Sequence, residues 1–271
     1  MTAVALTIAS SDSSGGAGIQ ADLKTFAALG VYGASVITSL TAQNTKGVTG
    51  VHDVPASFIA AQMDAVFSDL AIGAVKIGML SNAAAIEAVA QGLDRHAAGN
   101  IVLDPVMIAS SGDRLLAADA VASLRRLLIP RALVLTPNLP EAAALLDSHP
   151  ARDEIEMEAQ ARGIMEFGAN AVLIKGGHGE GPESVDLLVH VGGVTRLAAA
   201  RINTQNTHGT GCTLSSAIAA GLAKTSDLVS AARAAKHYVT KAIANADRLK
   251  IGHGHGPLHH FHEHWHDPEK Q

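Results

Sequence analysis

Short apolar runs alternate with longer segments in which apolar residues recur at helical spacing. Strand-like runs lie at residues 3–9, 32–40, 74–78, 101–103, 133–135 and 171–174, and helical patterns lie at residues 19–29, 57–70, 82–96, 115–128, 139–146, 153–167, 213–223 and 227–249. Two further runs, 185–190 and 194–200, flank Gly192 and Gly193 as in a β-hairpin. This alternation predicts an α/β fold with a mostly parallel central sheet and helices on both faces.

Residues 32–54 begin as a strand rich in β-branched residues and predict a small β flap. No repeat period and no low-complexity linker divides the chain. We therefore expect one domain over residues 1–251, followed by a histidine-rich C-terminal tail over residues 252–271.

Composition excludes several classes of protein. Hydrophobic residues make up 48% of the chain and charged residues 17%, which is enough for a core and excludes wholesale disorder. Aromatic residues make up only 3%, and 20 Lys and Arg face 25 Asp and Glu, so we expect no nucleic-acid partner. The single cysteine excludes an intrachain disulfide and favours a reducing compartment. Without a basic leader or an apolar span, we expect a cytoplasmic protein without membrane contact.

A glycine-rich loop from Asn206 to Thr213 follows a strand pattern and opens a helix. Gly209 and Gly211 let the backbone approach an anion closely, and the first N–H groups of a helix favour phosphate. Cys212 falls in the first helical turn, where the helix dipole typically lowers the pKa of a thiol. We therefore expect a thiolate that takes a proton from an attacking hydroxyl. The alternative is a small buried cysteine behind an ordinary turn.

A second loop, residues 10–18, also lies between a strand and a helix. Gly16, Gly18 and Ala21 formally match the dinucleotide fingerprint, but residues 39–44 lack the carboxylate that would hold a ribose. The chain also lacks a P-loop motif. We therefore interpret this loop as one that leaves space beside its backbone for a small ligand. A dinucleotide-dependent oxidoreductase is disfavoured.

Polar residues follow four predicted strands, at Asp12, Asp104, Asn138 and Lys175. The ligand crevice of an open α/β sheet lies outside the carboxyl ends of its strands, so we expect these residues to meet in one site. Asn138 and Glu141 share a helical face and suit hydrated Mg²⁺ beside phosphates. Taken singly, Glu141 could serve a helix dipole and Asp104 an ordinary turn.

The tail contains half of the chain's 14 histidines, in His-x-His spacings that suit Zn²⁺ or Ni²⁺. A metal-binding role for the tail is one alternative. We favour the other, a polar C-terminal segment that packs over a helix.

Spaced motifs in order along nearly the whole chain resemble those of the ribokinase-like superfamily. They are most similar to the hydroxymethylpyrimidine/phosphomethylpyrimidine kinases of thiamin biosynthesis. The motifs lie at residues 11–26, 42–45, 76–80, 103–107, 136–142 and 175–178, in the loop before Cys212, and at residues 253–261.

The resemblance implies a ribokinase-like fold and a homodimer that uses ATP and Mg²⁺. It implies phosphorylation of 4-amino-5-hydroxymethyl-2-methylpyrimidine and then of its monophosphate. The resemblance also implies residue roles. Gln43 would bind the aminopyrimidine edge, and Ala17, Met79 and Val106 would line the apolar ring pocket, with Asp12 in the substrate-binding set. Gly209, Gly211 and Cys212 would form the anion hole with Cys212 as base, Asn138 and Lys175 would lie near the ATP phosphates, and Asp104 and Glu141 would hold Mg²⁺.

A pyridoxine or pyridoxal kinase of the same superfamily is the alternative enzyme, because its loops are nearly the same. Gln43 and Met79 favour the pyrimidine. The amide of Gln43 offers both a donor and an acceptor, which matches an aminopyrimidine edge.

Overall fold

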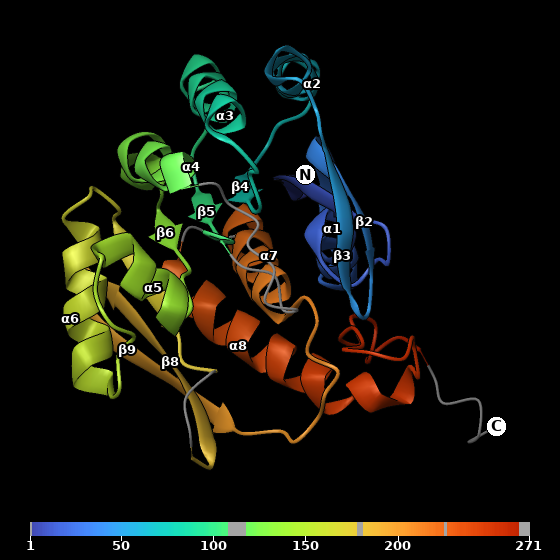
Figure 1. Cartoon of the computed structure of the whole chain (residues 1–271), viewed down its shortest axis with the longest axis vertical. Helices are drawn as coiled ribbons and strands as arrows, with labels where there is room; N and C mark the ends of the chain where they lie inside the picture. The colour runs from blue at the N-terminus through green and yellow to red at the C-terminus, as the bar shows by residue number, and fades with distance from the viewer. Residues whose placement is uncertain (1, 108–117, 178–180, 225–226, 266–271) are drawn as a thin grey trace.

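The strand-like runs assemble into a nine-stranded sheet (Figure 1). This computed structural model describes residues 2–107, 118–177, 181–224 and 227–265. The strands are β1 (Val4–Asp12), β2 (Tyr32–Asn44), β3 (Gly47–Asp53), β4 (Ala74–Ile77), β5 (Ile101–Leu103), β6 (Val134–Leu135), β7 (Ala171–Lys175), β8 (Glu183–His190) and β9 (Gly193–Ala200). Their order in the sheet is β3-β2-β1-β4-β5-β6-β7-β8-β9.

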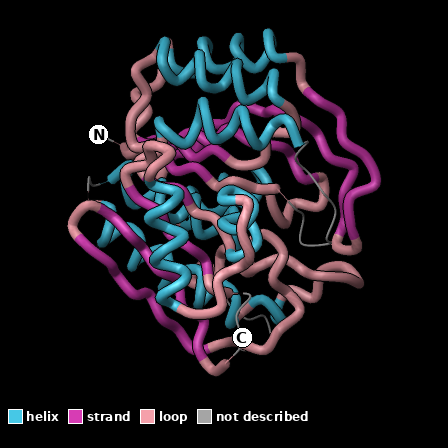
Figure 2. The backbone as a smooth tube through the Cα atoms, turned by 60° about the vertical axis from the view of Figure 1, so that its left-hand side comes forward, coloured by secondary structure: helices cyan, strands magenta, loops and turns pink. Residues whose placement is uncertain are grey.

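The centre of the sheet is parallel and both of its edges are antiparallel. Strands β2, β1, β4, β5, β6 and β7 pair in parallel, as the alternation of strands and helices predicts. Strand β3 folds back on β2 at one edge, and β8 and β9 extend the other edge as a hairpin (Figure 2). The predicted flap and hairpin are therefore both confirmed.

Helices cover both faces of the sheet. They are α1 (Gly18–Ala28), α2 (Ala56–Phe67), α3 (Ala83–Arg95), α4 (Ala118–Ser123), α5 (Leu139–Leu146), α6 (Glu154–Met165), α7 (Thr210–Lys224) and α8 (Leu228–Ala244). Successive strand residues point to opposite faces, so Val172 belongs to the apolar core on the face covered by α2–α6, while its neighbour Leu173 belongs to the core on the face covered by α1, α7 and α8. Two apolar cores result, one on each face.

The boundaries differ from the sequence prediction at functionally important places. Strand β1 runs on to Asp12, so this residue ends a strand instead of lying in a loop. Helix α7 begins at Thr210, three residues earlier than predicted, which places Cys212 in its first turn. The pattern at 115–128 becomes α4 and a π-helical turn (Leu124–Leu128), and residues 115–117 lie outside the described part. His178, at the end of one motif, also lies outside it.

The histidine-rich segment packs against the body as far as residue 265. His255 N–H donates to the carbonyl of Thr45 at the tip of the β2–β3 hairpin, with an N···O distance of 2.8 Å. The buried His260 ring lies 3.0 Å from the Thr213 hydroxyl of α7. The described residues show no group of three or more His, Cys, Asp or Glu side chains that could hold a metal ion. No described helix combines the length and the apolarity needed to cross a bilayer.

Candidate active site

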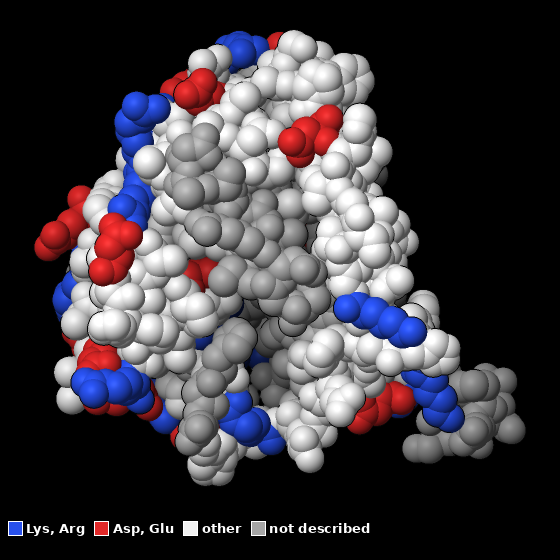
Figure 3. Space-filling view, viewed as in Figure 1, with Lys and Arg blue, Asp and Glu red and all other residues white. Residues whose placement is uncertain are grey.

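A cavity of about 650 Å³ lies where the parallel strands end. Every residue predicted for the site lines it: Asp12, Ala17, Gln43, Met79, Asp104, Val106, Asn138, Glu141, Lys175, Gly209, Gly211 and Cys212. The space-filling view shows acidic and basic side chains interspersed around this face, not gathered into one basic stripe (Figure 3). The cavity lining shows that the fold brings together residues that are up to 200 positions apart in the sequence.

The carboxylate of Asp12 organises the first loop. It accepts hydrogen bonds from the backbone N–H groups of Ser14, Gly16 and Ala17 at 2.8–3.2 Å, and it lies 2.9 Å from Nε2 of His208. Burial alone would raise the pKa of Asp12, but the hydrogen bonds from His208, Ser14 and Ala17 outweigh burial and lower it to about 2. Asp12 thus remains ionised and holds the loop in shape.

The two glycine loops interlock. A Cβ at Gly209, whose φ is +83°, would lie 1.9 Å from the carbonyl oxygen of Gly16. A Cβ at Gly16 would lie 2.3 Å from Cδ2 of His208. Close packing therefore requires glycine at both positions, and it places the His208 ring against the loop of residues 10–18.

Gln43 lies at the end of this arrangement. A register shift between Ala42 and Gln43 in the β2–β3 pairing re-aims the strand there. The Ser13 hydroxyl clamps the Gln43 backbone by donating to its carbonyl at 2.8 Å and accepting from its N–H at 2.9 Å. The Gln43 side chain lies 3.3 Å from Nε2 of His208 and accepts from the Thr41 hydroxyl at 3.0 Å. His208 is thus a site residue to which the sequence analysis gave no role, although it stands inside the glycine-rich loop.

The carboxylates of Asp104 and Glu141 flank the ammonium of Lys175. Lys175 Nζ lies 2.8 Å from Asp104 Oδ1 and 3.7 Å from Glu141 Oε2. Burial would raise the pKa of Asp104, but the charges of Lys175 and Lys76 outweigh it and lower that pKa. Burial raises the pKa of Glu141 to about 7, because the neighbouring Asp104 charge adds to burial and Lys175 only partly opposes them.

Asn138 and Glu141 also form a capping box at the start of α5. The Glu141 N–H donates to Asn138 Oδ1 and the Asn138 N–H donates to Glu141 Oε2, both at 2.8 Å. The sequence analysis left a helix-start role for Glu141 open, and the structure shows that role. Glu141 and the nearby Asp104 thus place two carboxylates at the cavity wall.

Cys212 lies half-buried at the cavity wall, in the first turn of α7. A Cβ on its neighbour Gly211 would lie 3.1 Å from Lys175 Nζ, so the helix start and this cation face the same space. Burial raises the pKa of the Cys212 thiol to about 11, although the charge of Lys76 and a hydrogen bond from Gly18 act in the opposite direction. The expectation of a lowered thiol pKa is therefore wrong for this structure, because the loss of hydration outweighs the favourable charges.

Comparison with known proteins assigns the family. A family model described as phosphomethylpyrimidine kinase matches residues 12–259. The chain is 61% identical over 267 residues to a hydroxymethylpyrimidine/phosphomethylpyrimidine kinase of Rhizobium meliloti, which covers 98% of this chain and 100% of the relative. The protein of the same name from Escherichia coli is 54% identical over 261 residues, covering 96% of this chain and 98% of the relative. The chain belongs to the phosphomethylpyrimidine kinase family.

Solved structures support the family fold. A Bacillus subtilis pyridoxal kinase in complex with ADP superposes with a TM-score of 0.90 at 35% identity, covering 98% of this chain and 100% of that chain. A phosphomethylpyrimidine kinase from Clostridium difficile superposes with a TM-score of 0.79 at 44% identity, covering 89% and 99%. The ribokinase-like fold predicted from the sequence is confirmed, and so is the prediction of a kinase.

The cavity has a second end that the sequence analysis missed. Beyond the glycine-rich loop (Asn206–Thr213), the cavity is lined by the apolar side chains of Leu214, Val239 and Ile243, from α7 and α8, and by Thr240. These residues carry no motif, since their helical spacing is indistinguishable from that of core residues. For a member of the phosphomethylpyrimidine kinase family, an apolar end beside an anion-binding helix start suits a nucleotide base.

Proposed function

We propose that this chain transfers the γ-phosphoryl group of ATP to 4-amino-5-hydroxymethyl-2-methylpyrimidine and then phosphorylates the monophosphate to the diphosphate. The observation that carries this proposal is one cavity that joins an apolar pocket beside Gln43 to a helix start beside Lys175. Near-complete alignment with relatives named for this activity supports it.

The pyrimidine would lie between Met79, Val106 and Ala17, which line the first part of the cavity. The Met79 backbone is fixed because its carbonyl accepts a hydrogen bond from Thr38 at 3.0 Å. The Gln43 amide would pair with the aminopyrimidine edge, in an orientation constrained by the hydrogen bond that its oxygen accepts from Thr41. This arrangement directs the hydroxymethyl group toward α7.

Phosphoryl transfer depends mainly on positioning and on stabilisation of charge. The N–H groups at the start of α7, around Gly209 and Gly211, would hold the transferred phosphoryl group, with Lys175 beside them. Cys212 would accept the proton of the acceptor hydroxyl as the new P–O bond forms and ADP leaves with the electron pair of the broken bond. Because the pKa of the thiol is about 11, the active thiolate is a small fraction at neutral pH.

The donor set fits Mg²⁺, which the family implies. Asp104 and Glu141 offer two buried carboxylates at the cavity wall, and Mg²⁺ is typically held by one or two carboxylates together with water and substrate phosphates. When bound, the ion would neutralise charge on the ATP phosphates. Asn138 would line the same phosphate region, and its side-chain oxygen caps α5.

A pyridoxal kinase is the second candidate. The observation in its favour is the TM-score of 0.90 to the Bacillus subtilis pyridoxal kinase, which exceeds the 0.79 to the phosphomethylpyrimidine kinase. The sequence comparison favours the pyrimidine, because the relatives with 54–61% identity carry the pyrimidine kinase name. Identity over the whole chain reflects pocket residues more directly than backbone shape does.

The test is release of ADP with four acceptors, namely hydroxymethylpyrimidine, its monophosphate, pyridoxine and pyridoxal. We expect kcat/KM to be highest for the two pyrimidines. A clear preference for pyridoxal would reject the pyrimidine assignment and leave the kinase assignment standing. Absence of ADP release above the acceptor-free rate with all four would reject both.

We further propose a cytoplasmic homodimer. The exposed apolar side chains of Leu40 and Val51 on the edge hairpin, with Phe58 on α2, offer a contact surface for a second copy. Light scattering with the purified chain tests this, and a monomer mass at micromolar concentration would reject it.

A further inference from the structure

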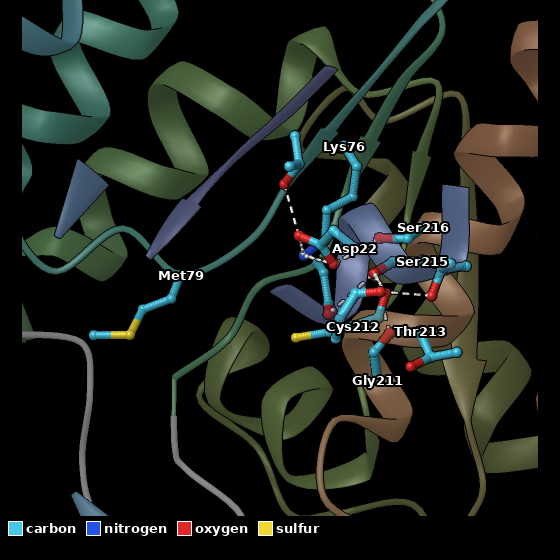
Figure 4. Close-up of polar contacts among 12 residues, drawn as sticks. Asp22, Lys76, Met79, Gly211, Cys212, Thr213, Ser215 and Ser216 are labelled. Carbon is cyan, nitrogen blue, oxygen red and sulfur yellow. Dashed lines mark hydrogen bonds and ion pairs between the residues drawn. The ribbon is translucent and has the colours of Figure 1, made fainter. Parts of the chain in front are cut away.

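A buried ion pair lies next to the first turn of α7 (Figure 4). The ammonium of Lys76, from β4, lies 2.8 Å and 3.0 Å from the two carboxylate oxygens of Asp22, from α1. Both side chains are fully buried. The roles proposed above for the cavity residues do not use this pair.

The ion pair is tied to the face of α7 that carries Cys212. The hydroxyl of Ser216 donates to Asp22 Oδ1 at 2.6 Å, and the hydroxyl of Thr7 donates to Oδ2 at 2.6 Å. Ser216 follows Cys212 by four residues, and residues at this spacing are neighbours on a helix surface. The carboxylate therefore fixes the ammonium beside the helical turn that contains the thiol.

The site is shaped around the ammonium. Lys76 lines the floor of the cavity together with Cys212, although its side chain is buried by protein. A Cβ at Gly78 would lie 2.6 Å from Lys76 Nζ, so glycine at this position leaves the space that the ammonium fills. Both hydrogen bonds of Nζ among the described residues go to Asp22, whereas an ammonium has three donors.

Stability alone does not account for such a pair. Removing two charges from water is costly, and well-packed apolar residues of similar volume often replace a buried ion pair without loss of stability. A charged pair kept at the cavity floor, hydrogen-bonded to the helix of the proposed base, indicates a task in the reaction.

The charged groups around the thiol come from four elements. Lys76 on β4 and Lys175 at the end of β7 favour the thiolate, whereas Asp22 on α1 and Asp104 after β5 disfavour it. Lys76 has the largest of the charge effects on the pKa of Cys212 and lowers it.

We propose that Lys76, held by Asp22, is a positioning residue that fixes a buried positive charge beside Cys212 and thereby stabilises the thiolate that accepts the substrate proton. This inference rests on the proposed kinase function for its meaning in catalysis. The charge effect itself can be measured without substrate.

The experiment uses the full-length chain, in which Cys212 is the one cysteine, so alkylation by iodoacetamide reports on this thiol alone. Below the thiol pKa, the alkylation rate follows the thiolate fraction, and a rise of the pKa by 1 unit slows it about tenfold. The variants are Lys76→Met, the charge-free pair Lys76→Met with Asp22→Asn, and the control Lys241→Met, which removes an exposed lysine charge paired with Glu263 on the surface. Circular dichroism and cooperative unfolding verify the fold of each.

We expect Lys76→Met to alkylate at least about tenfold more slowly than the wild type at pH 8, because an opposite charge nearby typically shifts a pKa by 1–3 units. The charge-free pair should be slowed by a smaller factor, because Asp22, which disfavours the thiolate, is removed as well. In both variants kcat should fall by a similar factor, with KM for ATP and for the pyrimidine within about twofold. Lys241→Met should remain within about twofold in every measurement.

A folded charge-free variant with wild-type alkylation would overturn the proposal, and so would a loss of kcat without a change in alkylation. If neither Lys76 variant folds, the alkylation rate of Gly78→Ala tests the proposal, because this variant keeps both charges and displaces the ammonium. Unchanged alkylation in that variant overturns the proposal, and slowed alkylation supports it. If the wild type fails to phosphorylate the pyrimidine, the proposed function fails while the alkylation result still judges the role of Lys76.

Discussion

Glu141 should make the protein less stable as the pH rises from about 4.5 to about 7. Its side chain is only 5% exposed, and burial with the adjacent Asp104 charge raises its pKa from 4.5 to about 7. In this window the unfolded chain has lost the Glu141 proton while the native state retains it. The native state therefore holds more protons, and stability falls with rising pH.

The size of this effect follows from the two pKa values. Each pH unit in the window costs the native state about 1.4 kcal/mol, or roughly 3 kcal/mol in total. Asp104 does not obscure the effect, because its lowered pKa in the native state and its ordinary pKa of 3.8 in the unfolded chain both lie below the window. Glu141→Gln keeps the shape and a capping oxygen for the Asn138 N–H, and it removes the titration.

The assay is urea unfolding of wild type and Glu141→Gln between pH 5 and pH 8. We expect similar free energies of unfolding near pH 5 and an advantage of roughly 3 kcal/mol for the variant at pH 8. Glu158→Gln, which removes an exposed carboxylate of α6 beside Arg162, is the control and should change stability by less than about 1 kcal/mol at both pH values. A wild-type-to-variant difference that does not depend on pH would refute the reasoning.

Three further predictions concern catalysis. Gln43→Ala leaves the aminopyrimidine edge unpaired at a cost of about 1–3 kcal/mol, so kcat/KM for the pyrimidine should fall roughly 5- to 150-fold with KM for ATP unchanged, and an equal loss in ATP binding would point to a misfolded loop instead. Cys212→Ala should lower kcat by ~10²–10⁴-fold, and near-full activity of this variant would exclude Cys212 as the base. The wild-type kcat should rise with pH from 7 to 9, because the thiolate fraction grows below a pKa of about 11. Cys212→Asp should keep partial activity with a flatter pH profile. Glu141→Gln and Asp104→Asn should each raise the Mg²⁺ concentration for half-maximal rate, and unchanged dependence in both would exclude the metal role.

The arrangement of elements was predictable because it depends on periodicity. The parallel centre of the sheet, the flap and the hairpin all follow from apolar spacing and from glycines such as Gly192 and Gly193. The carboxyl ends of parallel strands meet at one edge, so Asp104 and Lys175 could be placed together before their 2.8 Å contact was seen.

Burial was not predictable in the same way. The thiol of Cys212 was expected to be acidic from its place at a helix start, but the surrounding atoms raise its pKa to about 11. The role of His208 depends on the loop around Gly16, which lies nearly 200 residues earlier in the chain. Local sequence patterns do not predict contacts between residues so far apart in the chain. The pairing of Lys76 with Asp22 could not be predicted for the same reason.

The glycine-rich loop (Asn206–Thr213) is braced by residues that the ribosome adds about 50 positions later. The N–H of His208 donates to the carbonyl of Gly256 at 3.0 Å, and the ring of His260 holds Thr213 in the first turn of α7. Both braces arrive some 50 residues after the loop itself has been synthesised. During translation the sheet and most helices can therefore form while the first turn of α7 still lacks its support. The support of this loop is thus completed only once residues 256–260 have been synthesised, and a chain cut short before Gly256 would carry a loop with the right sequence and no brace to hold it.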